Sequence, residues 1–329
     1  MLTLPHFTWS RPATVHEALA ELAAHPGECL MVAGGTDAVP NLKHRLHEPR
    51  RIVSLGGIAE LRGIRIEDGA LVVGALTTLS ALSAHPHVRE HFAGVAQAAS
   101  LVASPQIRNM GTVGGNLCLD TRCTYYNQTF FWREALGFCL KKDGVRCHVV
   151  PQGKRCVAAH SSDVAPVWIA VGAEVEIAGP EGRRRQSVDD FFVGDGVHNN
   201  VLQSGEMVTR VIVPEASHGL STAYRKLRPR AAIDFPMLGV AVGARGTRER
   251  IESLRVVVSA LGAKPRVIGG LDALAAGQAL SPALADAIAV AAHKQCHPLI
   301  NVPYDADWRR DMVPVFVRRA LGDAFGGAA

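Results

Sequence analysis

Four of the seven cysteines in this 329-residue chain are concentrated between positions 123 and 156, in the pattern Cys123-x15-Cys139-x7-Cys147-x8-Cys156. Zinc sites usually take paired cysteines about two to four residues apart, because one tight turn then supplies two tetrahedral ligands. Here each thiolate would come from a separate bend. Wide spacing suits the well-separated corners of an iron–sulfur cube. The pattern therefore favours an iron–sulfur cluster, with a zinc ion and unligated thiols as the alternatives.

Basic and aromatic residues lie among these cysteines. Cations beside sulfur favour thiolate formation and raise the potential of a cluster by offsetting its negative charge. The aromatic run of Phe130, Phe131 and Trp132 can shield a cluster from water, or can simply pack in a core. The cations of the segment are Lys141, Lys142, Arg146, Lys154 and Arg155.

The other three cysteines have ordinary interpretations. Cys118 precedes Cys123 by five positions and could compete as a ligand, but it follows "GGNL" directly and is expected to pack beside that glycine turn. Cys29 and Cys296 are isolated, and a free buried thiol is the common state of such cysteines.

Two glycine turns could bind a diphosphate. "VAGGTD" (32–37) lies between an apolar strand and a helix, and "GTVGGN" (111–116) follows about eighty residues later. Glycines let a backbone approach phosphate oxygens closely and direct N–H groups toward them. Two such loops could hold one dinucleotide from both sides. The pattern is not the GxGxxG of a Rossmann unit, so a dinucleotide would bind in another architecture. Such turns also occur simply as strand-to-helix connections.

Two further residues are candidates for the polar end of a ligand. Asp163 in "HSSDVAP" could contact it, or could cap the helix that begins "VAPVW". Lys226 in "YRKLRPR" could place a cation near a flavin or phosphate, or could be a solvated strand lysine.

Composition excludes several classes of protein. The net charge of +5 is small, and the basic runs "RLHEPRR" and "EGRRRQ" lack interleaved aromatic residues, so no nucleic-acid partner is expected. No run reaches the roughly 18 apolar residues of a membrane span, and the N-terminus has no signal-peptide pattern. The expected location is therefore the reducing cytoplasm, where clustered cysteines are more often metal ligands than disulfides.

The elements that must position these residues fall into three regions. A helix over 12–25 with a Thr14 cap, the strand and helix around 28–46 and a strand–helix pair in 69–85 come first. The cysteine segment lacks strand or helix periodicity and looks like an insertion, after which strand-and-turn character resumes at 163–192. From Ser221, antiparallel strands followed by two helices indicate an α+β domain.

The motifs "VAGGTD", "RNMGTVGGNL", "SSDVAP", "GEMVTRVIVP" and "YRKLR", taken in order over nearly the whole chain, resemble the FAD-binding medium (β) subunits of the molybdenum hydroxylase (xanthine dehydrogenase) family. The cysteine segment most closely resembles the insertion of the 4-hydroxybenzoyl-CoA reductase β subunits. The resemblance implies an α+β fold. Its first part is a two-lobed FAD-binding domain of the vanillyl-alcohol-oxidase/PCMH type over 1–217, with lobes of about 1–55 and 56–217 and a cluster loop at about 119–158. A C-terminal domain of the CO dehydrogenase flavoprotein type follows over 218–329.

The same resemblance implies the cofactor ligands. A [4Fe–4S] cluster would be held by Cys123, Cys139, Cys147 and Cys156. FAD would be contacted by Ala33, Gly34, Gly35, Thr36, Asp37, Thr112, Gly114, Gly115, Asn116, Asp163 and Lys226.

The implied function is electron transfer within a larger enzyme. Partner subunits would supply a molybdopterin cofactor and two [2Fe–2S] clusters, in a dimer of heterotrimers. Reduced ferredoxin would deliver electrons for the dehydroxylation of 4-hydroxybenzoyl-CoA in aromatic degradation, docking near Lys141, Lys142 and Lys154. The alternatives are an aldehyde or N-heterocycle oxidoreductase, a zinc-stabilised binding protein and a stand-alone flavin oxidase. No catalytic residue is expected in this chain, because it shows no Ser/His/Asp or paired-carboxylate constellation.

Overall fold

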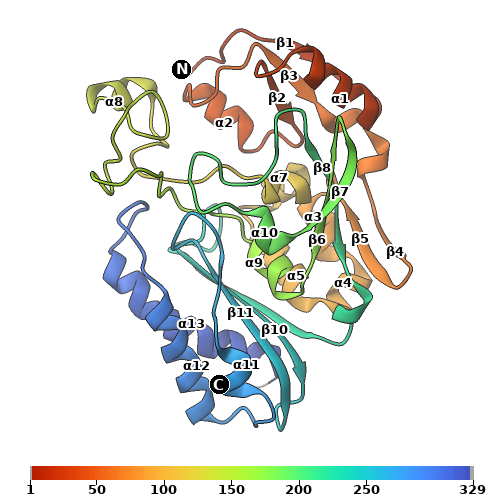
Figure 1. The fold of residues 1–329 in the computed structure, drawn as a ribbon, viewed down its shortest axis with the longest axis vertical. Helices are drawn as coiled ribbons and strands as arrows, with labels where there is room; N and C mark the ends of the chain where they lie inside the picture. Colours follow the sequence, from red (N-terminus) through yellow and green to blue (C-terminus); the bar gives the residue numbers. More distant parts are fainter. Residues whose placement is uncertain (1, 327–329) are drawn as a thin grey trace.

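The computed structural model describes residues 2–326. These residues contain three β-sheets, each covered by helices (Figure 1). The first sheet is parallel and has the order β1-β3-β2. Helix α1 (Val15–Ala24) connects β1 to β2. It is capped by Thr14, whose hydroxyl accepts a hydrogen bond from the Glu17 N–H at 3.1 Å. The remaining elements of this lobe are β1 (Thr8–Ser10), β2 (Cys29–Val32), α2 (Ala38–Lys43) and β3 (Arg51–Ser54).

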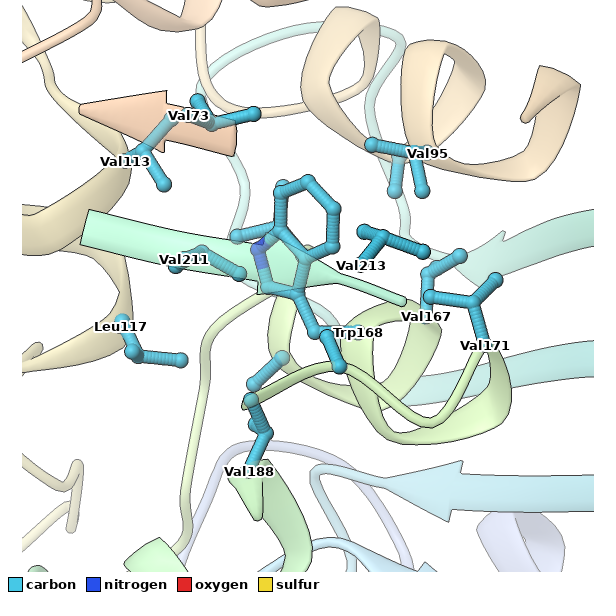
Figure 2. Packing of buried hydrophobic residues seen from close by; sticks show 14 of the residues in the cluster. Val73, Val95, Val113, Leu117, Val167, Trp168, Val171, Val188, Val211 and Val213 are labelled. Atoms are coloured by element: carbon cyan, nitrogen blue, oxygen red, sulfur yellow. The ribbon is translucent and has the colours of Figure 1, made fainter. Parts of the chain in front are cut away.

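The second sheet is antiparallel, in the order β4-β5-β8-β6-β7, and forms the centre of the molecule. Its largest core residue is Trp168, which is fully buried among the valines of β5 and β8 and Leu117 (Figure 2). Burial of such an aromatic side chain is a dominant stabilising contribution. The strands are β4 (Ile64–Glu67), β5 (Ala70–Gly74), β6 (Glu174–Gly179), β7 (Gly182–Ser187) and β8 (Met207–Val213). The helices are α3 (Leu79–Ala84), α4 (Pro86–His91), α5 (Ala93–Ser100), α6 (Pro105–Met110), α7 (Val113–Leu117), α9 (Ala165–Ala170) and α10 (Val188–Phe191).

The third sheet, in the order β12-β11-β10-β9, is antiparallel and carries the last helices on one face. Arg309 of α13 is fully buried there and donates hydrogen bonds to three backbone carbonyls, including that of Ala260 at 2.7 Å. The strands are β9 (Ser221–Leu227), β10 (Leu238–Gly246), β11 (Ile251–Ser259) and β12 (Arg266–Val267). The helices are α11 (Leu271–Ala275), α12 (Pro282–Gln295) and α13 (Ala306–Ala324), and the 3₁₀ turns of the chain are η1 (Leu55–Gly57), η2 (Ala59–Leu61) and η3 (Glu215–Ser217).

The cysteine segment projects from the side of the molecule as a long loop with one short helix, α8 (Phe130–Ala135) (Figure 1). Its two ends lie side by side, because Arg122 and Ala159 exchange both backbone hydrogen bonds, at 2.8 and 2.7 Å. The loop is therefore a closed excursion from the central lobe.

The predicted fold class is confirmed: sheets with segregated helices are followed by an α+β unit. Helix α9 precedes the strands in 163–192, which agrees with the alternative that a helix begins at "VAPVW" and not with strand-and-turn character from residue 163. Apolar residues surround α9 on all sides, so it shows no amphipathic period. Among residues 2–326, no helix combines the length and the apolar character that crossing a membrane requires.

The buried carboxylate of Glu176 in β6 is expected to stabilise the central sheet. It accepts hydrogen bonds of 2.7 Å from Arg210, Arg183 and Thr209. Burial alone would raise the pKa of Glu176, but these bonds outweigh burial and lower it to about 2. Glu176→Gln should lower the free energy of unfolding at pH 7 by about 1–3 kcal/mol, measured by denaturant titration.

The same carboxylate also predicts a pH dependence. Its pKa in the folded state lies below the ordinary glutamate value of 4.5, so its contribution to stability is complete above that pH and is lost as the pH falls toward 2. The difference in stability between the wild type and Glu176→Gln should shrink over this interval. Glu48→Gln is the control, because the side chains of Glu48 and its partner Arg45 are 49% and 33% exposed and such pairs contribute about 0–1 kcal/mol. Equal losses in both variants would contradict the assignment.

Candidate functional site

A cavity of about 540 Å³ lies where the first sheet meets the central sheet. Its volume falls in the range of small-molecule sites. Ten of the eleven residues predicted to contact FAD line it, and Lys226 does not. The ten are Ala33, Gly34, Gly35, Thr36, Asp37, Thr112, Gly114, Gly115, Asn116 and Asp163.

The two glycine turns touch each other at this cavity. A Cβ atom on Gly34 would lie 1.8 Å from the carbonyl oxygen of Met110, which directly precedes the second turn. A Cβ atom on Gly114 would lie 2.8 Å from the Cβ of Ala75. Glycine is therefore required at both positions by close packing and not by backbone angle. The turns form one continuous wall of the cavity, with backbone groups at its surface.

Side chains in the second turn hold its shape. The Thr112 hydroxyl accepts a hydrogen bond from the Gly115 N–H at 3.1 Å and begins α7. The Asn116 carboxamide oxygen accepts one from the Ser162 hydroxyl at 2.6 Å. The segment before the cysteine loop is thus tied to the segment after it.

Asp163 and Lys226 form a buried pair behind the cavity wall. The Lys226 ammonium lies 2.9 Å from one carboxylate oxygen of Asp163, and the Tyr224 hydroxyl donates to the other at 2.8 Å. Burial raises the pKa of Asp163 and lowers that of Lys226, and their attraction opposes both shifts. Lys226 therefore supports Asp163 and does not reach the cavity. Asp163 is also not a helix cap, since Ser162 accepts the Ala165 N–H at 3.0 Å.

Several lining residues were not predicted from the sequence. Ile233, Asp234 and Phe235 of the C-terminal region contribute to the wall, as do His47 and Asp120. None belongs to a glycine turn or another recognisable motif. Arg122 holds this part of the cavity wall in place. Its guanidinium lies over the Phe235 ring, 4.3 Å from the ring centroid, and forms an ion pair with Asp37. Burial lowers the pKa of Arg122 to about 10.

All four cysteines of the loop line a second, smaller cavity. Cys139, Cys147 and Cys156 are 6–7% exposed, and Cys123 is partly buried. Around the thiols lie Tyr125, Tyr126, Leu140, Lys141, His148, Val149, Val157 and Ala158. Within residues 2–326, no three His, Cys, Asp or Glu side chains are grouped so as to hold a single metal ion.

The thiols have an environment of mixed character. Burial raises the pKa of Cys123 to about 11 and also raises that of Cys156. Backbone N–H groups of Val150 and Ala158 donate to the sulfurs of Cys147 and Cys156, at 3.4 and 3.5 Å. The raised pKa values favour the protonated thiols of Cys123 and Cys156, and a metal centre bound there would have to displace those protons.

The loop is anchored at both of its sides. Arg133 of α8 is buried and donates to the carbonyls of His44 and Arg45 at the end of α2, at 3.3 and 3.0 Å. Asn301 of the C-terminal region is fully buried and bonds to both ends of the loop, at Thr124 and Val157. These contacts fix the thiols relative to the larger cavity.

Comparison with known proteins agrees with this arrangement. A family model described as the FAD binding domain in molybdopterin dehydrogenase matches residues 5–216. A second, the CO dehydrogenase flavoprotein C-terminal domain, matches residues 222–324.

Individual relatives match over most or all of the chain. The carbon monoxide dehydrogenase medium chain of Hydrogenophaga pseudoflava is 29% identical over 99% of both chains. The structure of that enzyme lacking the Mo-pyranopterin moiety includes a chain that superposes with a TM-score of 0.81 at 28% identity, covering 99% of this chain and 100% of the other. The aldehyde oxidoreductase FAD-binding subunit PaoB of Escherichia coli is 34% identical over 71% of this chain and 76% of its own. The chain therefore belongs to the FAD-binding medium subunits of the molybdenum hydroxylase family, and it is an oxidoreductase subunit.

Proposed function

We propose that this chain carries FAD in the larger cavity and a [4Fe–4S] cluster between the four loop cysteines, and that it transfers electrons within a molybdenum hydroxylase complex. The observation that carries the proposal is that four distant cysteines line one cavity beside the flavin-type pocket. Within residues 2–326 we identify no acid, base or nucleophile arrangement for substrate chemistry.

The glycine wall suits the diphosphate of FAD. Among the described residues, the N–H groups of Gly34 and Gly35 donate to no acceptor and are open to phosphate oxygens, whereas those of Gly114 and Gly115 donate to the Ala75 carbonyl and the Thr112 hydroxyl. Apolar residues such as Leu55, Leu61 and Leu79 line other parts of the same cavity. A polar end and an apolar remainder match a dinucleotide with a charged diphosphate and a flat aromatic flavin ring. Membership of a family of FAD-binding domains supports this choice.

The four thiols suit an iron–sulfur cube better than a single ion by their number and spacing; the cavity between them measures about 10 Å³, so the thiols would have to move apart as a cluster binds. A zinc ion needs its sulfurs about 2.3 Å from one point, and no such group occurs within residues 2–326. A cube instead binds each thiolate at a separate corner, which agrees with four thiols spread around one space. The N–H groups directed at Cys147 and Cys156 are of the kind that tunes cluster potentials. When bound, the cluster would supply one-electron transfer to and from the flavin.

The complex is proposed to contain a large molybdenum-binding subunit and a small subunit with two [2Fe–2S] clusters, assembled as a dimer of heterotrimers. The support is family membership and the naming of the relatives as medium chains or FAD-binding subunits. Substrate would react at the molybdenum of the partner, and this chain would exchange electrons with it.

For the reaction, the likeness of the cysteine loop favours reductive removal of the 4-hydroxyl group of 4-hydroxybenzoyl-CoA. Two electrons and two protons convert it to benzoyl-CoA and water, and two reduced ferredoxins would supply the electrons. Docking of an acidic ferredoxin would use exposed cations such as Lys154 and Arg155. Lys141 is wrong as a docking residue, because its side chain is only 5% exposed.

A second candidate is a complex that oxidises aldehydes, with electrons flowing outward from molybdenum. The observation in its favour is the 34% identity with the FAD-binding subunit of an aldehyde oxidoreductase.

The glycine contact predicts flavin content. Gly34→Ala would drive a methyl group against the Met110 carbonyl and separate the two turns. We expect at least about a tenfold loss of bound flavin, since a shift worth 1.4 kcal/mol in binding already gives that factor. Flavin is measured by absorbance after denaturation. Gly194→Ala is the control, because a Cβ there meets nothing within 4 Å. Full flavin in the Gly34 variant would contradict the assignment.

The cysteine cavity predicts metal content. Anaerobically purified protein should contain about four irons per chain and no stoichiometric zinc. Cys147→Ala should lose most of this iron, while Cys118→Ala and Cys296→Ala should keep it, because these two thiols lie outside the cysteine cavity. Iron and zinc are measured by elemental analysis. Zinc in place of iron, or equal iron loss in the controls, would refute the cluster.

Turnover separates the two complexes. The purified native complex, supplied with reduced ferredoxin, should convert 4-hydroxybenzoyl-CoA to benzoyl-CoA, with product detected by chromatography. The rate should fall as salt rises, because exposed loop cations are screened within about 10 Å at 0.1 M. Reduction of an acceptor by aldehydes, with no conversion of the thioester, would instead favour the second candidate.

A further inference from the structure

We propose that Lys141 is a fixed buried cation that raises the redox potential of the cysteine-loop cluster, and that Asp120 is its counter-charge on the flavin side. The inference rests on the proposed cluster and adds which residues set its potential. Together the two side chains form a charge pair in the wall between the two cavities.

Lys141 lines the cysteine cavity and is held there by several acceptors. Its ammonium lies 2.6 Å from an Asp120 carboxylate oxygen, 2.5 Å from the Thr121 hydroxyl and 2.7 Å from the Gly196 carbonyl. The face of the Tyr126 ring lies 4.4 Å away. A side chain bonded in this way and only 5% exposed is held in a fixed position.

Asp120 lies on the other side of the same wall. It lines the flavin-type cavity, whereas Lys141 and Cys123 line the cysteine cavity. Its second carboxylate oxygen accepts a hydrogen bond from the Tyr126 hydroxyl at 3.0 Å and lies 3.7 Å from His47. Lys141 therefore borders the cysteine cavity, and its partner Asp120 borders the larger cavity.

Lys142, Lys154 and Arg155 differ from Lys141 in exposure, and the buried Arg133 does not line the cysteine cavity. The Lys142 side chain is 31% exposed and pairs with Asp143 at 3.2 Å. Lys154 and Arg155 are exposed to solvent. Water and salt screen such charges, while a charge inside the protein acts through a low dielectric. Lys141 should therefore act on the cluster much more strongly than its neighbour in the chain.

The physical effect has a definite sign. Reduction adds one negative charge to a cluster, so a nearby cation stabilises the reduced form and raises the potential. A nearby carboxylate does the opposite. Removing Lys141 should lower the cluster potential, and removing the charge of Asp120 should raise it.

The test is a redox titration of the cluster, followed by electron paramagnetic resonance in the anaerobically purified chain. Lys141→Met should decrease the ratio of reduced to oxidised cluster at a fixed potential about tenfold, which corresponds to 59 mV for one electron. Asp120→Asn should shift the ratio in the opposite direction. The double variant should return toward the wild type. Lys141→Arg keeps the charge and Lys142→Met removes the exposed one, so both should remain within about twofold of the wild type.

The outcomes separate this inference from the proposed function. Wild-type protein without iron refutes the cluster itself. A loaded cluster whose potential does not move in either charge variant, or moves in the same direction in both, overturns the role of the pair. Loss of the cluster in both variants also overturns it, because the pair would then serve assembly. If only Lys141→Met fails to bind the cluster, the potential measured in Asp120→Asn decides: a rise supports the role of the pair, and no change or a fall overturns it.

Discussion

The pair of backbone hydrogen bonds between Arg122 and Ala159 is the constraint on which the cysteine loop depends. The four thiols come from bends with almost no regular structure, so nothing within the loop alone would bring them together. Joining the two ends removes much of the entropy that a free loop of this length would have. Asn301 and Arg133 then fix the loop to the C-terminal region and to the first lobe. Convergence of the thiols follows from these anchors.

The same anchors fix the distance between the two proposed cofactors. The chain passes from the glycine wall through Asp120 directly to Arg122 and Cys123, so one short segment borders both cavities. Arg122 also pairs with Asp37 of the first glycine turn. A rigid wall of this kind suits electron transfer, which requires closely and reproducibly placed carriers and no moving part.

Much of this arrangement could be predicted from local patterns. The glycine turns could be recognised from the sequence, because close packing at Gly34 and Gly114 admits no side chain and so requires glycine there. The start of the first helix could be recognised from Thr14, whose hydroxyl caps it. Lys226 was predicted as a contact but is the buried partner of Asp163, since the sequence does not reveal which face of a strand is covered. Ile233 to Phe235 were missed because tertiary packing alone brings them to the cavity. The burial of Lys141 likewise depends on acceptors distant in sequence.

Anomalous X-ray diffraction on either side of the iron absorption edge, from crystals of the anaerobically purified chain, tests the central claim most directly. The account predicts an iron-specific peak enclosed by the sulfurs of Cys123, Cys139, Cys147 and Cys156, and electron density for a flavin dinucleotide along the glycine wall. An empty cysteine cavity, or a peak that appears only at the zinc edge, would contradict it.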